Sequence, residues 1–367
     1  MDLYCFRNRY VDIFEQTALN PFLKKLSEGL AQFPPETKFL VGISGGRDSM
    51  CLLYGLLALE YRQLTLCHLN HQLRGAAARM DECFVIYQAQ KLGLSLKLAR
   101  AQTEQFASDH GLCTETAARE LRYTFFAEVA KEAHCSTLLL AHHADDQLET
   151  CWINLLRGTG TAGLAGMRME SARRVKKGRE GILRIIRPLL RLFRSEVVQF
   201  SCERKIPFRE DATNQDTNLM RNRIRHELLP FLDRRFGINY RRAMLRCAEI
   251  LADEEDWMRE ITERFSCKTP RLAYNELYPL PRALQRRILR RWLLKQGVPE
   301  VGFAAVERVR SLTILPISQP AKVNLPFRIH ARRRSGMLFL EKSPRSRQVC
   351  RKAVRYLLVN QLQHVPA

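Results

Sequence analysis

The chain has 367 residues, of which 46% are hydrophobic and 8% aromatic, which suffices for two or three packed domains and excludes a disordered protein. No stretch approaches the roughly 20 apolar residues of a bilayer span and no signal-peptide pattern occurs, so we expect a cytoplasmic protein with no membrane partner. The net charge of +22 favours a polyanionic partner such as nucleic acid, although solubility or a membrane-surface patch would also explain it. The 11 cysteines include no Cys-x-x-Cys, which indicates free thiols and argues against a zinc ribbon or an iron–sulfur cluster.

Strand-like and helical patterns alternate through the first half of the chain. Apolar runs at 38–43, 64–70, 95–100 and 136–143 predict buried strands, and the apolar spacing at 48–60, 77–92, 114–133 and 145–156 predicts helices. Such alternation implies right-handed crossovers onto a parallel sheet. The fold class we expect is therefore α/β, with a doubly wound parallel sheet.

The second half has a different pattern. Long helical patterns at 240–265, 282–295 and 301–312 predict a helical domain, and two strand-like runs flank the Arg-Ser-Gly turn within 322–342, which predicts a hairpin. We expect a catalytic domain at 1–235, a helical domain at 236–315 and a small β-containing segment at 316–367. No pattern indicates a role for residues 343–367.

A glycine-rich loop, SGGRDS, joins the first strand to its helix at the carboxyl edge of the sheet, where doubly wound folds bind ligands. Its glycines let backbone N–H groups converge on an anion, and the following helix N-terminus attracts negative charge. The alternative is that a side chain of the loop only caps the helix. The residues expected to bind the phosphates of ATP are Ser44, Gly45, Gly46, Arg47, Asp48 and Ser49.

The loop lacks the lysine that serves γ-phosphoryl transfer in kinases and GTPases. A loop that cradles pyrophosphate through backbone and hydroxyl groups instead suits cleavage between the α- and β-phosphates, with transfer of AMP. The Arg47 N–H is expected to join this cradle while its guanidinium points to solvent.

Several further stretches narrow the assignment. They are HLNHQLR (68–74), ETAARELRYTFF (115–126), AHHADDQLET (141–150), LLRGTGTAGLAGM (155–167), RPLL (187–190) and FREDATNQD…RNRIRHELLP (208–230). Together with the loop they resemble the tRNA(Ile)-lysidine synthetase family, within the pyrophosphate-loop ATP pyrophosphatases, over roughly residues 38–235. The downstream part resembles that family's tRNA-binding region in texture only.

The resemblance implies a reaction. ATP adenylates the C2 oxygen of the wobble cytidine in an isoleucine tRNA with a CAU anticodon, and the side-chain amine of free L-lysine displaces AMP to form lysidine. ATP is then the co-substrate and Mg²⁺ the metal, and the helical region at 236–315 would bind the tRNA.

Three carboxylates are the candidate catalytic residues: Asp48, Asp145 and Asp146. The last two follow the fourth strand, at the same edge of the sheet as the loop. Asp48 and Asp145 could hold Mg²⁺, and the remaining carboxylate could bind the ammonium of lysine and help to deprotonate it, although which serves which is open. Alternatively the pair only caps the next helix, or it binds zinc with His142 and His143, although adjacent strand residues point to opposite faces.

The candidate substrate-binding residues are His71, Arg74, Arg221 and Arg223. The first two lie at a strand end, where a histidine is also often a core residue, and the arginines of RNRIRH could grip phosphate or form a solvated helix face. Glu115, Arg119 and Arg122 share one helix face as an ion-pair ladder or a buried brace. The basic stretch 173–194 and the helix at 282–297 fit the phosphates of an RNA stem.

Rival functions remain open from the residues alone. A sulfur-inserting tRNA enzyme would usually carry paired cysteines, and a small-molecule ligase such as GMP synthetase would need a glutaminase segment. A non-catalytic RNA-binding protein would not need the intact loop. The oligomeric state, a homodimer included, and the discrimination between isoleucine and methionine tRNAs are not indicated.

Overall fold

The computed structural model describes residues 20–175, 181–210, 219–265, 269–299, 301–314, 321–342 and 362–364. The chain forms two compact units, Met1–Ala252 with Asn360–Ala367 (unit 1) and Asp253–Val359 (unit 2). The division between them lies within the long helix α12 (Asn239–Glu263), whereas the sequence analysis places its first boundary after residue 235. None of the described helices combines the length and the apolar character that a bilayer span requires.

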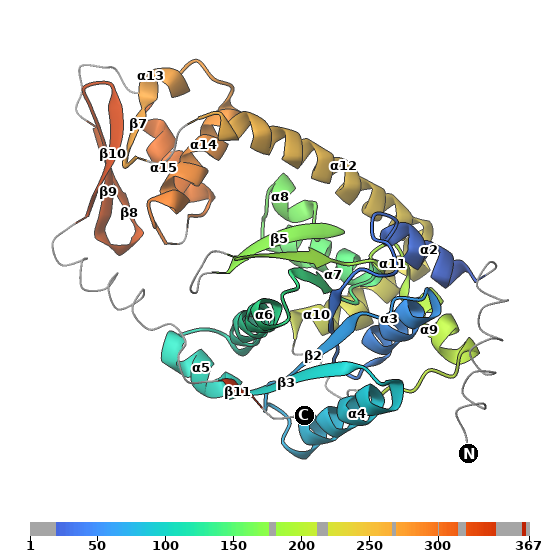
Figure 1. The fold of residues 1–367 in the computed structure, drawn as a ribbon. Helices are drawn as coiled ribbons and strands as arrows, with labels where there is room; N and C mark the ends of the chain where they lie inside the picture. Colours follow the sequence, from blue (N-terminus) through green and yellow to red (C-terminus); the bar gives the residue numbers. More distant parts are fainter. Residues whose placement is uncertain are drawn as a thin grey trace, which may run out of the picture. The chain divides into compact units, whose positions relative to one another are not determined.

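Unit 1 is built on one sheet in the strand order β11-β3-β2-β1-β4-β6-β5 (Figure 1). Its parallel strands are β1 (Phe39–Gly42), β2 (Leu64–Asn70), β3 (Ser95–Ala101), β4 (Thr137–Leu139) and β6 (Gly181–Ile186). Two antiparallel strands complete it, with β5 (Glu170–Val175) beside β6 and β11 (Leu362–His364) beside β3. The four strands expected from sequence are β1 to β4, and the doubly wound α/β fold is confirmed.

Helices cover both faces of this sheet because each central strand is apolar on both sides. Phe39 and Val41 of β1 pack with α2 (Pro21–Gly29), α3 (Arg47–Ala58) and α9 (Arg194–Glu203). Leu40 points the other way, into a second cluster with α6 (Thr114–Glu132). The remaining helices among the described residues of unit 1 are α4 (Ala76–Leu92), α5 (Thr103–His110), α7 (Ala144–Leu156), α8 (Thr161–Leu164), α10 (Met220–Arg223), the π-helical turn η2 (Ile224–Leu228) and α11 (Leu229–Phe236).

The strand order creates a switch point at β1. The chain leaves β1 to form β2 on one side and β3 beyond it, and returns to form β4 on the other side of β1. The crossovers from β1 and β4 therefore diverge, which opens a crevice at the carboxyl ends of these two strands. Residues 44–49 follow β1 and residues 140–143 follow β4, so both sequence motifs lie at this crevice.

The π-helical turn η2 lies in a continuous helical run from α10 to α11. Pro230, at the start of α11, has no N–H to donate to the carbonyl of His226, and its ring would clash with that carbonyl in a regular α-helix. The wider π turn over Ile224–Leu228 removes this conflict without breaking the helix.

Unit 2 packs α13 (Tyr274–Leu277), α14 (Arg282–Lys295) and α15 (Phe303–Ser311) against an antiparallel sheet in the order β7-β10-β9-β8. The strands are β7 (Arg271–Ala273), β8 (Ala321–Leu325), β9 (Ile329–Arg334) and β10 (Met337–Lys342), with a 3-10 turn η3 (Pro326–Arg328) before β9. The fully buried Trp292 of α14 lies in their shared core. The predicted hairpin is β9–β10, turning at Ser335 and Gly336, whose φ angles of 49° and 75° are both positive. Most of the tail after Lys342 lies outside the described residues.

Gly29, at the end of α2, provides a test of packing behind the site. A Cβ there would lie 2.9 Å from the backbone oxygen and 3.1 Å from the Cα of Pro188. Alanine favours a helix over glycine by about 1 kcal/mol, so a purely local effect of Gly29→Ala would be stabilising. We expect instead a loss of about 1–3 kcal/mol in the free energy of unfolding, because backbone must move to admit the methyl group.

Chemical denaturation of purified protein measures this loss. Gly160→Ala is the matched control in unit 1, because a Cβ at Gly160 meets no atom within 4 Å and its φ of −84° suits alanine. Equal stability of the two variants would contradict the close approach of α2 to Pro188.

Candidate functional site

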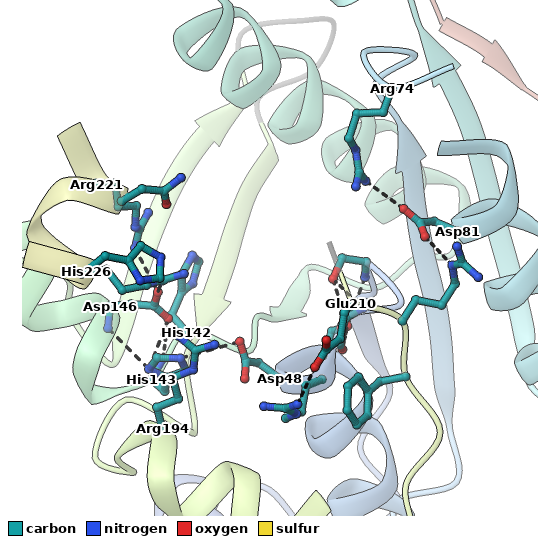
Figure 2. A pocket seen from close by; sticks show the side chains of 18 of the residues that line it. Asp48, Arg74, Asp81, His142, His143, Asp146, Arg194, Glu210, Arg221 and His226 are labelled. Carbon is teal, nitrogen blue, oxygen red and sulfur yellow. Dashed lines mark hydrogen bonds and ion pairs between the residues drawn. The ribbon is translucent and has the colours of Figure 1, made fainter. Parts of the chain in front are cut away.

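A cleft at the switch point has two lobes, of about 590 and 680 Å³. Asp48, Arg74, Arg122 and Asp146 are among the residues that line both lobes. Among the described residues that border the first lobe, seven are arginines and four are carboxylates, so these residues favour an anionic ligand. Figure 2 shows two groups of interacting side chains on opposite sides of this lobe, one around His143 and Asp146 and the other around Arg74 and Asp81.

The glycine loop is held open by its own serines. Ser44 Oγ accepts from the N–H of Gly46 at 3.2 Å, and Ser49 Oγ donates to the Gly46 carbonyl at 2.9 Å. Gly45 has a φ of 85°, which only glycine adopts readily. No described side chain caps α3, whose N-cap is Gly46. The free N–H groups at the start of α3 therefore face the cleft without an internal partner, as an anion-binding helix terminus requires.

Arg47 does not point to solvent, and that expectation is wrong. Its guanidinium lies 4.4 Å from the centre of the Phe208 ring and 2.9 Å from Glu210 Oε1. The backbone N–H of Arg209 donates to the Gly45 carbonyl at 2.9 Å. Residues 208–210 therefore bind along the glycine loop. This explains why the stretch that begins with Phe208 belongs to the site.

Asp81 orients two arginines across the lobe. Its carboxylate accepts from Arg74 Nη2 at 2.8 Å and from Arg209 Nε at 2.6 Å. Both arginines line the lobe, so this carboxylate holds them toward an anion bound at the loop.

Asp146, His143 and Asp48 form a coupled group on the other side. His143 begins α7: its N–H donates to Asp146 Oδ2 at 3.0 Å, and its Nδ1 accepts from the Asp146 N–H at 3.4 Å. His143 Nε2 lies 3.6 Å from Asp48 Oδ2. The capping role that the sequence left as an alternative is thus real, and Asp146 caps α7 while it also borders the cleft.

The charges of this group shift its pKa values in opposite directions. Burial disfavours protonated His143, but the carboxylates of Asp146, Asp48 and Asp145 outweigh that cost and raise its pKa above the usual value. Burial likewise opposes ionised Asp146, yet His143, Arg221 and His142 lower its pKa to about 2. His142 is driven by burial to a pKa of about 3, and its buried Nδ1 has no hydrogen-bond partner among the described residues.

Asp145 is directed away from the cleft. One of its oxygens accepts from Arg241 of α12, and the other accepts the N–H of Arg194 at 2.7 Å, at the start of α9. It does not border either lobe. The structure therefore separates the two neighbouring aspartates, with Asp146 at the cleft and Asp145 linking three helices.

Two arginines of the RNRIRH stretch converge on a fully buried carboxylate. Arg221 Nε and Arg225 Nε each lie 2.6 Å from an oxygen of Glu149, and Arg221 Nη2 also reaches Asp146 Oδ1 at 3.0 Å. Both arginines line the first lobe. Arg223 is exposed, donates to the sulfur of Met220 at 3.8 Å and is not among the described residues that border the cleft.

The second lobe is more apolar and holds the histidines of the second strand. Arg122 Nη2 donates to His71 Nε2 at 3.3 Å, so Nδ1 carries the proton and donates to Thr103 Oγ1 at 3.1 Å. Burial and Arg122 lower the pKa of His71 to about 3, which keeps the ring neutral. Arg122 itself is exposed to solvent, so the buried-brace alternative is wrong for this residue, although it does bind His71. His68 donates to the Ile43 carbonyl at 2.9 Å, and its buried Nε2 has no partner among the described residues.

Comparison with known proteins identifies the family. The profile of the PP-loop domain matches residues 16–232, and that of the TilS substrate binding domain matches residues 272–339. The chain is 32% identical over 328 residues to the tRNA(Ile)-lysidine synthase of Dehalococcoides mccartyi, a match that covers 85% of this chain and 67% of that protein. The chain belongs to the tRNA(Ile)-lysidine synthase family.

Two other relatives have the same name. The protein of Geobacter sulfurreducens is 36% identical over 80% of this chain and 63% of its own length. That of Caldanaerobacter subterraneus subsp. tengcongensis is 30% identical over 87% of this chain and 68% of its own length. The chain therefore spans about two thirds of the length of these lysidine synthase relatives.

The sequence analysis did not predict several of the residues that border or support the cleft in the structure. Asp81, Arg194 and Arg209 border the cleft but were not named as site residues, although Arg194 ends the basic stretch 173–194 and Arg209 lies in the stretch 208–230. Arg225 and Glu149 could have been found by helical spacing. Arg225 is four residues after Arg221, so it shares its face, whereas Arg223 is two residues away and points elsewhere.

The arrangement of the carboxylates bears on which metal ion the site could bind. Among the described residues, no group of three or more His, Cys, Asp or Glu side chains has the geometry of a metal site, which leaves zinc without a ligand set. Mg²⁺ needs fewer protein ligands, because it is commonly bound by one or two carboxylates together with substrate phosphates and waters. Asp48 fits this role, since it belongs to the glycine loop, borders the cleft and has a side chain that is 42% exposed.

The coupling between Asp48 and His143 predicts a shift in titration. Asp48→Asn removes one of the charges that favour protonated His143, so the pKa of His143 should fall. The titration of the His143 ring protons by NMR measures this fall. Asp109→Asn is the control, because Asp109 lies on α5 and contacts only Gln105 among the described residues. An unchanged His143 pKa in Asp48→Asn would contradict the pairing.

The same shift makes stability depend on pH. Since the pKa of His143 is higher in the folded chain, its contribution is complete below the unfolded value of about 6.5 and is lost as pH rises through the folded value. Asp146 has the opposite sign, because its lowered pKa stabilises the fold above about 3.8 and this contribution is lost as pH falls toward about 2. The pH profile of unfolding free energy should therefore be flatter above pH ~6.5 in Asp48→Asn than in the wild type.

Proposed function

We propose that this protein ligates lysine to C2 of the wobble cytidine in an isoleucine tRNA with a CAU anticodon, using ATP and releasing AMP and pyrophosphate. The observation that carries the proposal is the switch-point cleft, in which an uncapped glycine loop faces a surplus of arginines. Membership of the tRNA(Ile)-lysidine synthase family also supports this proposal.

ATP fits across the two lobes. Its β- and γ-phosphates would lie on the N–H groups of residues 45–49, with Arg74 and Arg209 alongside. The second lobe would take the nucleoside, because it is lined by apolar groups such as Ile43 and Leu140 and by His68, whose free Nε2 can accept from an amino group. The α-phosphate would then lie between the lobes, near Asp48 and Asp146.

Mg²⁺ would be held by Asp48 together with the phosphates of ATP. When bound, the ion would neutralise charge that develops on the leaving pyrophosphate. Asp145 is less suited to this role, because its oxygens already bind Arg241 and the N–H of Arg194. Its part in the proposal is to position α7 and α9.

The amine of lysine must lose a proton before it attacks, since its reference pKa is about 10.4. Asp146 is a weak base, with a pKa of about 2, so it serves better to bind the ammonium than to deprotonate it. The arginines provide the driving force instead. Departure of pyrophosphate would leave their charge unbalanced, which lowers the pKa of a bound amine and frees the nucleophile after adenylation.

In this reaction the cytidine C2 oxygen first attacks the α-phosphorus, and pyrophosphate leaves. The lysine nitrogen then bonds to C2 as the C2–O bond to AMP breaks, and one amine proton leaves to solvent. The chain's own residues orient the reactants. Arg221 and Arg225, braced by Glu149, lie where they can bind the α-carboxylate of lysine or a tRNA phosphate.

Nucleoside mass spectrometry tests the proposed activity. Unmodified isoleucine tRNA with a CAU anticodon, incubated with protein, ATP, Mg²⁺ and lysine, should gain the mass of the lysine adduct at a single cytidine. Its absence with folded protein would refute the proposal, and a sulfur adduct in the presence of a sulfur donor would favour the thiolating rival.

Asp48→Asn and Asp146→Ala should keep the fold and lose at least about 100-fold in turnover, because the first weakens the proposed Mg²⁺ site and the second removes the proposed partner of the lysine ammonium. Asp109→Asn, remote on α5, should retain full turnover. Full activity in both site variants would refute the assignment of these carboxylates.

Salt dependence separates the two substrates. Affinity for tRNA should fall steeply with added salt, because phosphate contacts release counterions, while affinity for ATP should change much less. Equilibrium binding of each ligand between 50 and 200 mM salt, about the range over which this effect spans orders of magnitude, makes the comparison. Equal sensitivity of both would count against a long RNA contact.

A further inference from the structure

Fewer arginines of the basic helix α14 are available for RNA than the sequence predicts. Three of its arginines are engaged inside unit 2, as Arg286–Glu307 at 2.7 Å, Arg287–Glu255 at 2.6 Å and Arg291 with the Thr262 carbonyl. These contacts join α14 to α12 and α15. The exposed cations of the helix are only Arg282, Arg290 and Lys295. A different basic surface in unit 2 is therefore needed to explain how this unit would contact RNA.

The antiparallel sheet of unit 2 has one buried face and one open face. Side chains directly opposite each other on paired strands point to the same face. The register places Leu272, Leu338, Arg333 and Ala321 in one row across β7, β10, β9 and β8, and all four are buried. This face packs on α14 and α15, and Figure 1 shows these helices on one side of the strands.

The next row points the opposite way and reads Arg271, Phe339, Arg332 and Lys322 across the same four strands. The three cations are exposed and the aromatic ring between them is half-buried. Since neighbouring strands are about 4.8 Å apart, the row spans roughly 14 Å. We call this side the outer sheet face.

The rows on either side keep the face basic. Arg334 lies opposite Met337, and Glu341 lies opposite His330, so the face carries four arginine or lysine side chains and one carboxylate. Glu341 pairs with Arg332 at 2.9 Å, but both side chains are more than 40% exposed. Such an exposed pair is weak and can exchange for a phosphate. The side chains of Arg271, Lys322, Arg332 and Arg334 are all exposed among the described residues, so this face is open to solvent there.

We propose that the outer sheet face binds an RNA strand, with an unpaired base stacked on Phe339 and neighbouring phosphates on Arg271, Arg332 and Lys322. The proposal deepens the proposed function and rests on it, because the tRNA substrate supplies the RNA. An open sheet with an aromatic ring among cations is a recurrent platform for single-stranded nucleic acid, since stacking tolerates any base and the cations follow the backbone. A negatively charged protein would satisfy the cations but would leave the ring without a stacking partner.

Charge-matched variants of the full chain test this surface. One variant carries Arg271→Ala, Lys322→Ala and Arg332→Ala, and its control carries Arg282→Ala, Arg290→Ala and Lys295→Ala on the exposed side of α14. Both lose the same charge. The outer-face variant should raise the Kd for tRNA at least about 10-fold and reduce the slope of log K against log salt by about 2, while the control changes the Kd less than about 2-fold.

Stacking is tested separately by Phe339→Leu, which keeps an apolar side chain but removes the aromatic ring. It should raise the Kd for tRNA about 5- to 10-fold without changing the salt slope. Met337→Leu, on the same face and strand, is the control and should bind as the wild type. Affinity for ATP should be unchanged in all four variants, because the candidate cleft lies in unit 1.

The outcomes distinguish this surface from the proposed function. Lysidine formation by the wild type, with the outer-face and α14 variants binding tRNA equally well, would overturn the surface and leave the function standing. RNA binding through this face without lysidine formation would support the surface and refute the function. Loss of affinity for polyglutamate, but not for tRNA, in the outer-face variant would overturn the RNA assignment in favour of an acidic protein.

Discussion

The placement of β1 between β2 and β4 is the constraint on which the site depends. It makes the two crossovers diverge, so the glycine loop and the start of α7 open onto one crevice. An anion-binding loop alone would be a shallow surface feature. The residues that follow β4 supply the histidines and the carboxylate opposite the loop. Residues 208–210 and α10, later in the chain, border the remaining sides of the crevice.

Two carboxylates, each bound to two arginines, keep the arginines of this crevice in place. Asp81 holds Arg74 and Arg209, and Glu149 holds Arg221 and Arg225. A long guanidinium side chain loses much rotamer freedom when it binds phosphate, and fixing it beforehand removes part of that cost. The carboxylates also limit repulsion among cations while the cleft holds no anion. The site is thus organised for its ligand by its own acidic residues.

Local pattern was sufficient to predict the first half of the fold and the position of the loop. Strands buried on both faces and helices of regular spacing are encoded by neighbouring residues, and the edge at which their loops meet follows from the right-handed crossover. The choice between adjacent polar residues was not predictable in the same way. Asp145 and Asp146 differ only in which contacts reach them, and the contact that withdraws Asp145 comes from Arg241, 96 residues away in sequence. The net charge was informative about partners in general, yet the arginines most prominent in α14 turned out to be structural.

The contact of Arg47 with Phe208 and Glu210 gives the variable position of the loop motif an unexpected meaning. Because the partners lie 163 residues apart, this position belongs to the loop in sequence but to a second segment in packing. Substitution of Arg47 would first remove the contacts with Phe208 and Glu210, and it would affect phosphate binding only through them. If the six-residue loop were moved into another protein, its backbone N–H groups would be retained, but the contacts of Arg47 with Phe208 and Glu210 would be lost. The residue at the position of Arg47 would then have to be chosen to fit the neighbouring surface of the new protein.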